Sequence, residues 1–88
     1  MIDAAQIRAA RGLLDLTQAE LSELASVSVA SVKRVEAAAT IRGSAEVVWK
    51  IQTALESAGI EFIPADERKG PGVRLKQAAS RDRAKKKR

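Results

Sequence analysis

The sequence predicts a mainly α-helical fold of four short helices, followed by two short β-strands and a disordered basic tail. Apolar residues recur at helical spacing through residue 58, and a residue able to cap a helix precedes each apolar stripe. After Gly59, apolar and polar residues alternate as they do in strands. We therefore divide the chain into a helical domain at residues 1–59, a strand pair at 60–76 and a tail at 77–88.

The first helix is expected from residue 4 to residue 15 or 16. Asp3 and Gln6 have the spacing of a capping box, in which each side chain accepts the other residue's backbone N–H. Gly12 within this helix costs about 1 kcal/mol relative to alanine. The residues expected to face the interior are Ile7, Ala10 and Leu14.

The second helix is expected to begin at Gln18, because Thr17 and Glu20 form a second capping box. Its expected interior residues are Leu21, Leu24 and Ala25. Ser28 then caps a third helix that lasts to about Ala37. The buried stripe of this third helix is expected to contain Val32 and Val35.

A connector at residues 38–43 leads to the fourth helix, which Ser44 caps and Gly59 ends. Its expected interior residues are Val47, Val48, Ile51, Ala54, Leu55 and Ala58. Trp49 lies about 160° around the helix from the centre of this stripe. Trp49 therefore either packs against the following strand of its own chain or anchors a partner surface.

The two strands flank a turn-rich loop at residues 64–72. The alternating residues are Ile60, Glu61, Phe62 and Ile63 in the first strand, and Val73, Arg74, Leu75 and Lys76 in the second. The loop is long enough to close a hairpin or to send the second strand to a neighbouring copy. A chain of about 60 residues buries only roughly 60% of its unfolded surface on folding, so dimerisation would add to the stability of the fold. The expected dimer or partner surface contains Trp49, Ile60, Phe62, Val73 and Leu75.

The net charge of +5, from 16 basic and 11 acidic residues, is unevenly distributed. Residues 1–63 carry six basic and eight acidic residues, a balance of −2, whereas residues 64–88 carry ten and three, a balance of +7. The tail, densest from Arg81 to Arg88, either grips phosphates without sequence preference or is simply solvated. The basic balance therefore describes a tail rather than the folded domain.

The absence of cysteine and histidine excludes disulfides, Cys/His zinc sites and histidine-based catalysis. The sequence shows no nucleophile–base pair and no glycine-rich phosphate loop, so we expect neither an enzyme nor a cofactor or metal. It also lacks a membrane-length apolar run and a signal-peptide pattern. We expect a cytoplasmic, nucleoid-associated protein with no membrane partner.

Residues 18–36 have the layout of a helix-turn-helix. Two short helices cross steeply across a tight turn when the residues at their contact are small. Ser22 and Ala25 are small at the expected contact, and Val27 follows the turn as an apolar plug. The agreement of several positions makes this pattern fairly specific.

At these residues the chain resembles the Xre/Cro-type, phage-repressor-like helix-turn-helix regulators. The motifs are Leu16-Thr-Gln-Ala-Glu-Leu21, Val27-Ser28 and Val32-Lys-Arg-Val-Glu36, within a resemblance that covers residues 3–58. Residues 54–63 and 70–75 resemble a short bacterial subgroup that ends in such a strand pair. The resemblance implies a repressor-like domain that binds double-stranded DNA as a homodimer on an inverted repeat, with the third helix in the major groove. The alternative is a protein-binding antiactivator or antitoxin-like module with the same fold.

The resemblance also implies which residues contact DNA. They are Thr17, Gln18, Ser28, Val29, Ala30, Ser31, Lys33, Arg34 and Arg42. Gln18 would donate to a phosphate, helped by the N-terminus of the second helix. Lys33 would reach guanine acceptors or a phosphate, whereas Arg34 and Arg42 suit phosphates. Gln18, Arg34 and Arg42 could instead be ordinary solvated residues.

The chain departs from the family pattern at three places. Ser26 occupies a turn position where glycine is usual, so we expect a left-handed residue at a cost of about 1 kcal/mol. The glycine that often follows the third helix is missing, so the connector is expected to take another path. Val29 and Ala30 offer apolar contacts, such as with a thymine methyl, instead of the family's polar base readers. Arg11 and Glu36 match its interhelical ion pair.

Overall fold

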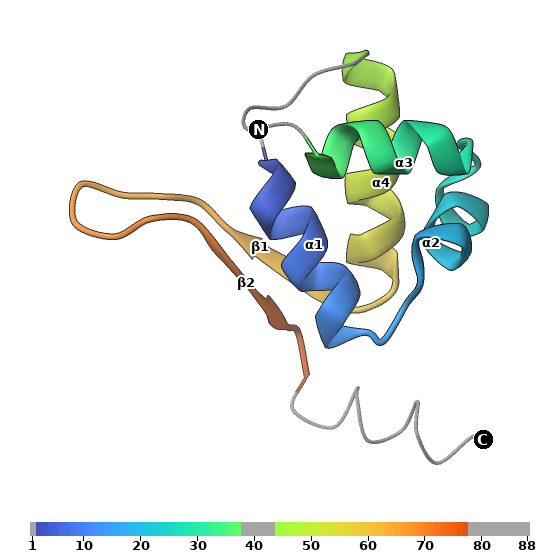
Figure 1. Ribbon diagram of the computed structural model, residues 1–88. Helices are drawn as coiled ribbons and strands as arrows, with labels where there is room; N and C mark the ends of the chain where they lie inside the picture. Colours follow the sequence, from blue (N-terminus) through green and yellow to red (C-terminus); the bar gives the residue numbers. More distant parts are fainter. Residues whose placement is uncertain (1, 38–43, 78–88) are drawn as a thin grey trace.

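The computed structural model describes residues 2–37 and 44–77 (Figure 1). Its elements, in chain order, are α1 (Ala4–Leu13), α2 (Gln18–Ala25), α3 (Val29–Ala37), α4 (Ala45–Ser57), β1 (Ile60–Ile63) and β2 (Gly72–Leu75). This order confirms the predicted fold class of four helices followed by two strands. The predictions for the connector at residues 38–43, and for the tail beyond Gln77, lie outside the described residues.

The helix starts are set by side-chain caps, as the sequence predicts. Both capping boxes form: the Asp3 side chain accepts from Gln6 N, and the Thr17 side chain accepts from Glu20 N. Ser28 Oγ accepts from Ser31 N at 3.0 Å, and Ser44 Oγ accepts from Val47 N at 3.1 Å. Each cap satisfies a backbone N–H that has no partner within its helix.

The predicted end of α1 is wrong by two or three residues, because a left-handed turn closes the helix at Leu13. Asp15 has a φ of 57°, and Leu16 N donates to Arg11 O at 3.0 Å. Asp15 N donates to Gly12 O at 3.2 Å, which completes a Schellman motif. The predicted stop after α4 is confirmed, since Gly59 has a φ of 113°.

The core lies where the four helices and β1 meet. Its buried apolar side chains are Ile2, Ile7, Ala10, Leu21, Ala25, Val32, Val35, Val48, Ile51, Leu55 and Ile60. Two predicted interior residues are exposed instead. The buried face of α2 consists of Leu21, Ser22 and Ala25, which leaves Leu24 on a flank, 55% exposed. Ala58 lies beyond the last turn of α4 and faces solvent.

The strands β1 and β2 pair antiparallel within the chain, with Ile60 opposite Leu75 and Ile63 opposite Gly72. Figure 1 shows this hairpin beside α1, with its loop projecting beyond the helices. Gln6 fastens the hairpin to α1: its Nε2 donates to Ile63 O at 3.2 Å and to Gly72 O at 2.9 Å. Gln6 thus serves both the cap of α1 and the anchoring of the strands.

Within the described ranges, no helix combines the length and the apolar character needed to span a lipid bilayer.

Candidate nucleic-acid interface

The turn between α2 and α3 fixes the angle at which α3 leaves the domain. Ser26 adopts the predicted left-handed conformation, with φ 58° and ψ 45°. Ser26 N donates to Glu23 O at 3.3 Å, and Val27 N donates to Ser22 O at 3.0 Å. These bonds close α2 and leave a three-residue turn before Val29, as a helix-turn-helix requires.

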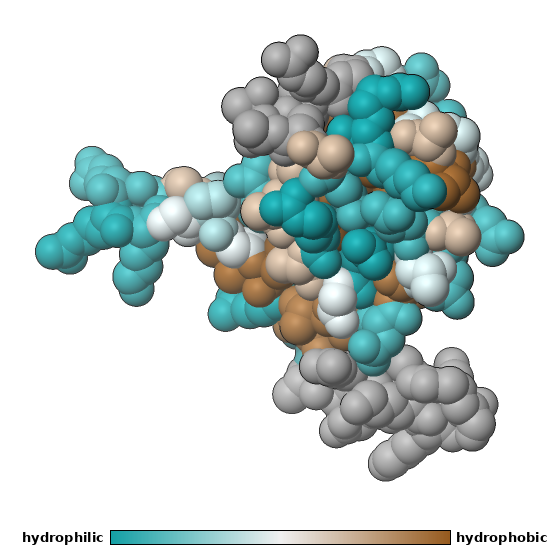
Figure 2. All heavy atoms as spheres, viewed as in Figure 1, coloured by the Kyte–Doolittle hydropathy of each residue, from teal (hydrophilic) through white to brown (hydrophobic). Residues whose placement is uncertain are grey.

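Helix α3 divides into an inner and an outer face. Val32 and Val35 are 0% and 1% exposed and face the core. Ala30, Lys33 and Arg34 are exposed on the outer face, and Val29 and Ser31 are half-buried at its margin; Ser28, which precedes the helix, is also exposed. Figure 2 shows hydrophilic residues over α3 and the adjoining part of α1. The structure therefore presents the predicted DNA-facing residues of α3 on one side of one helix.

The charges on the outer face of α3 are not neutralised by the described part of the chain. Lys33 and Arg34 are exposed and form no ion pair or side-chain hydrogen bond there. The other cations of the helices are engaged: Arg11 pairs with Glu36, and Lys50 pairs with Glu46. Arg42, predicted as a phosphate contact, lies outside the described residues.

Of the three hydroxyl groups predicted at the interface, those of Thr17 and Ser28 act as helix caps. Ser28 Oγ also donates to Ser31 Oγ at 2.9 Å, so these two hydroxyls form a pair at the start of α3. Thr17 Oγ1 accepts from Glu20 N at 3.0 Å at the start of α2. The Ser31 hydroxyl proton is still available as a donor, because in this pair Ser31 Oγ is the acceptor.

A buried carboxylate connects α1, α2 and α3. Glu36, 4% exposed, accepts from Arg11 Nε at 2.9 Å, from Arg11 Nη2 at 3.0 Å and from Gln18 Nε2 at 3.1 Å. Arg8 Nη1 donates to the backbone oxygen of Glu36. We call Arg8, Arg11, Gln18 and Glu36 the Glu36 network.

The ion pair between Arg11 and Glu36 confirms the sequence prediction. The hydrogen bond from Arg11 to Glu36 raises the pKa of the guanidinium; the nearby negative charge raises it further, against a lowering by partial burial. The pair with Glu36 therefore favours the charged form of Arg11. The bonds from Arg8 and Gln18 were not predicted, because their spacing from Glu36 carries no periodic signal.

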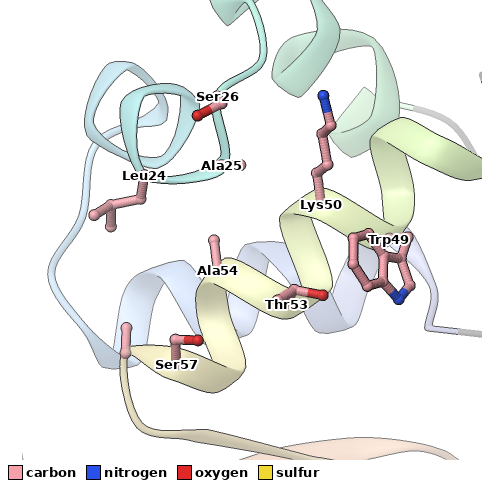
Figure 3. Close-up of a pocket in the computed structure, with 9 residues that line it drawn as sticks. Leu24, Ala25, Ser26, Trp49, Lys50, Thr53, Ala54 and Ser57 are labelled. Carbon is pink, nitrogen blue, oxygen red and sulfur yellow. The ribbon is translucent and has the colours of Figure 1, made fainter.

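A groove lies between α2 and α4 on another side of the domain (Figure 3). It has a volume of about 460 Å³, and its lining includes Leu24, Trp49, Lys50, Ala54 and Ser57. Trp49 is 64% exposed, and with Leu24 it is one of two large apolar side chains exposed in the described residues. The alternative that Trp49 packs against the strand of its own chain is therefore wrong, because most of its side chain faces solvent and it is not among the apolar residues packed against the core.

The strand residues predicted at the dimer or partner surface are less accessible than Trp49. Ile60 is 0% exposed, so its assignment to that surface is wrong: β1 turns this side chain into the core. Phe62, Val73 and Leu75 are half-buried and pack against the core. Their outer edges remain in contact with solvent.

Comparison with protein-family models matches residues 7–61 to HTH_3, described as helix-turn-helix. The matched span runs from within α1 to β1 and contains α2, α3 and the Glu36 network. No curated protein matches the chain.

Proposed function

Because the chain belongs to the Xre/Cro-type helix-turn-helix family of DNA-binding regulators, we propose that it binds a specific double-stranded DNA site with α3 in the major groove. The observation that carries this proposal is the division of α3. Its inner face is held by the core, and its outer face offers the unpaired cations Lys33 and Arg34. The activity would regulate transcription at the nucleoid.

The proposed contacts divide into two groups. Thr17, Gln18, Arg34 and Arg42 contact phosphates and set the position of the domain on the duplex. Ser28, Val29, Ala30, Ser31 and Lys33 face the bases. Lys33 and the Ser31 hydroxyl are donors suited to purine or thymine acceptors, and the two apolar residues suit thymine methyl groups. A site rich in A·T pairs, with guanine near Lys33, fits this surface best.

We further propose that the protein binds an inverted repeat as a homodimer, with half-sites about one helical turn apart. The exposure of Trp49 supports a dimer contact at the groove between α2 and α4, with the outer edges of Phe62, Val73 and Leu75 as further candidates. Sedimentation should give a dimer for the full chain and a monomer for Trp49→Ala. A Trp49→Ala variant that remained dimeric would exclude the groove as the interface.

The experiment for DNA binding is a mobility-shift titration on a duplex selected by the wild-type chain from a random library. Lys33→Ala should weaken binding about tenfold or more, since one lost base contact costs roughly 1–3 kcal/mol. Lys69→Ala, which removes an exposed charge from the hairpin loop, is the matched control and should change binding about twofold or less. Equal affinity of wild type and Lys33→Ala would exclude α3 as the reading helix.

The groove also favours a second candidate function, a protein-binding antiactivator or antitoxin-like module. Exposed apolar side chains that line a groove are typical of protein contacts. In this case Trp49→Ala would abolish capture of a stable protein partner, whereas Lys33→Ala would not. Specific DNA binding without any stable protein partner would argue against this second function.

A further inference from the structure

The Glu36 network joins the buried end of α3 to the first residue of α2. We infer that Glu36 is a positioning residue for DNA binding: it holds the Gln18 amide in the orientation that donates to a phosphate. The inference rests on the proposed function, since it concerns how Gln18 meets DNA.

The chemistry of the carboxylate determines which end of the Gln18 amide faces inward. An ionised carboxylate accepts hydrogen bonds and cannot donate them. Glu36 Oε1 therefore holds Gln18 Nε2, at 3.1 Å, and would repel Gln18 Oε1. A glutamine without such a partner can turn its amide by 180°, and half of its orientations would present an oxygen to the phosphate.

The held nitrogen still has a hydrogen to give. An amide Nε2 carries two N–H groups, and Glu36 accepts one of them. Gln18 is half-buried and is the first residue of α2. At this position its second N–H adds to the backbone N–H groups of the helix start, which already favour an anion. A phosphate at this helix end would receive both kinds of donor.

The carboxylate that orients Gln18 is itself rigidly held. Arg11 donates to both oxygens of Glu36, and its Nη1 donates to Leu16 O at 3.0 Å, just before α2. Arg8 holds the Glu36 backbone oxygen. Glu36 therefore has one position relative to both the end of α1 and the start of α2.

A double-mutant cycle in DNA affinity tests the inference on the full chain. The variants are Gln18→Ala, Glu36→Gln and their combination, titrated on the duplex selected by the wild type. Gln18→Ala should weaken binding about tenfold, because a hydrogen bond to a charged group is lost. Glu36→Gln should weaken binding about fivefold in the wild-type background, and less than about twofold when Gln18 is already alanine.

The matched control is the same cycle with Lys33, which lies on α3 but makes no bond to Glu36. The fold-losses of DNA affinity caused by Glu36→Gln and by Lys33→Ala should multiply in the double variant, within about twofold, because the two effects are independent. Equal losses from Glu36→Gln in the presence and absence of the Gln18 side chain would overturn the inference and give Glu36 a purely structural role.

Two further results complete the design. The folded fraction of each variant is measured by circular dichroism, and Glu36→Asp replaces Glu36→Gln in the cycle if the latter does not fold. Glu36→Asp keeps the charge but withdraws it by one methylene, so the same coupling is expected. A wild-type chain that selects no duplex would instead reject the proposed function itself, before any variant is compared.

Discussion

Gly12 lies within α1, although glycine has a low helix propensity. It lies in α1 without a positive φ, and a Cβ added there would meet no atom within 4 Å. Ser26 and Asp15, in contrast, adopt left-handed conformations that glycine would relieve. The sequence predicts both the helical position of Gly12 and the left-handed conformation of Ser26. It does not predict the left-handed conformation of Asp15, because a single aspartate is common in many turn types.

Gly12→Ala should stabilise the chain by about 0.5–1 kcal/mol, because alanine loses less backbone entropy on entering the helix. Urea unfolding followed by circular dichroism measures the change. Gly59→Ala is the control and should destabilise, since Gly59 has a φ of 113°. Unchanged or lower stability of Gly12→Ala would show that the helix is constrained at this position in some other way.

The two hydrogen bonds by which Gln6 holds the hairpin can be tested by substitution. Gln6→Glu keeps an oxygen for the capping box but loses the N–H groups that hold Ile63 O and Gly72 O. The buried carboxylate would then face two carbonyl oxygens, at a cost of about 1–3 kcal/mol. Ala5→Glu adds the same charge on the exposed side of α1 and should be nearly neutral in urea unfolding. Similar effects of the two variants would exclude the anchoring role of Gln6.

Among the elements, the helices followed most directly from the sequence. Local signals set them: the caps at Asp3, Thr17, Ser28 and Ser44, and the period of the apolar residues. Contacts between elements were less predictable. The spacing of apolar residues places Leu24 on the buried stripe, but its exposure depends on how α2 meets α4, which spacing within α2 does not encode. For the same reason, the bonds from Gln6 to the strands and from Gln18 to Glu36 became visible only in the structure.

The hairpin supplies a pH-dependent prediction. Arg74 donates to Glu61 across the strand pair, Nε to Oε1 at 2.8 Å, and this hydrogen bond lowers the pKa of Glu61. Because the folded pKa lies below the unfolded one, the pair contributes stability above the unfolded pKa. That contribution is lost as the pH falls through the lowered pKa, on the acid side of about pH 4.

Amide hydrogen exchange or NMR shifts at residues 61 and 74 should therefore show the strands loosening at acid pH. Asp66 also has a lowered pKa, since it accepts from the backbone N–H groups of Arg68 and Lys69. Glu61→Gln distinguishes the Glu61 carboxylate from that of Asp66. This substitution should abolish the pH-dependent change at the strands and leave the change at the loop intact. An unchanged acid transition at residue 74 in Glu61→Gln would contradict the assignment. Both carboxylates lie at the surface, so the effect on overall stability is small.

In the whole molecule, the distribution of charge distinguishes the helical domain from the basic tail in the proposed DNA binding. Residues 1–63 have a balance of −2, so attraction by the helical domain as a whole is not expected. The proposed recognition of DNA then depends on a few local cations, chiefly Lys33 and Arg34. The family match over residues 7–61 supports the DNA-binding class. The proposed base-facing positions of α3 include the apolar Val29 and Ala30, which would limit how many bases it can read.

Selection from a random DNA library tests the central claim most directly, because it assumes no binding site. The full chain should enrich an inverted repeat whose half-sites are centred about 10 base pairs apart, as a dimer with α3 in the major groove requires. The double variant Lys33→Ala/Arg34→Ala, which keeps the basic tail, should enrich no repeat. Equal enrichment by both proteins, or no enriched sequence with the wild type, would contradict the account.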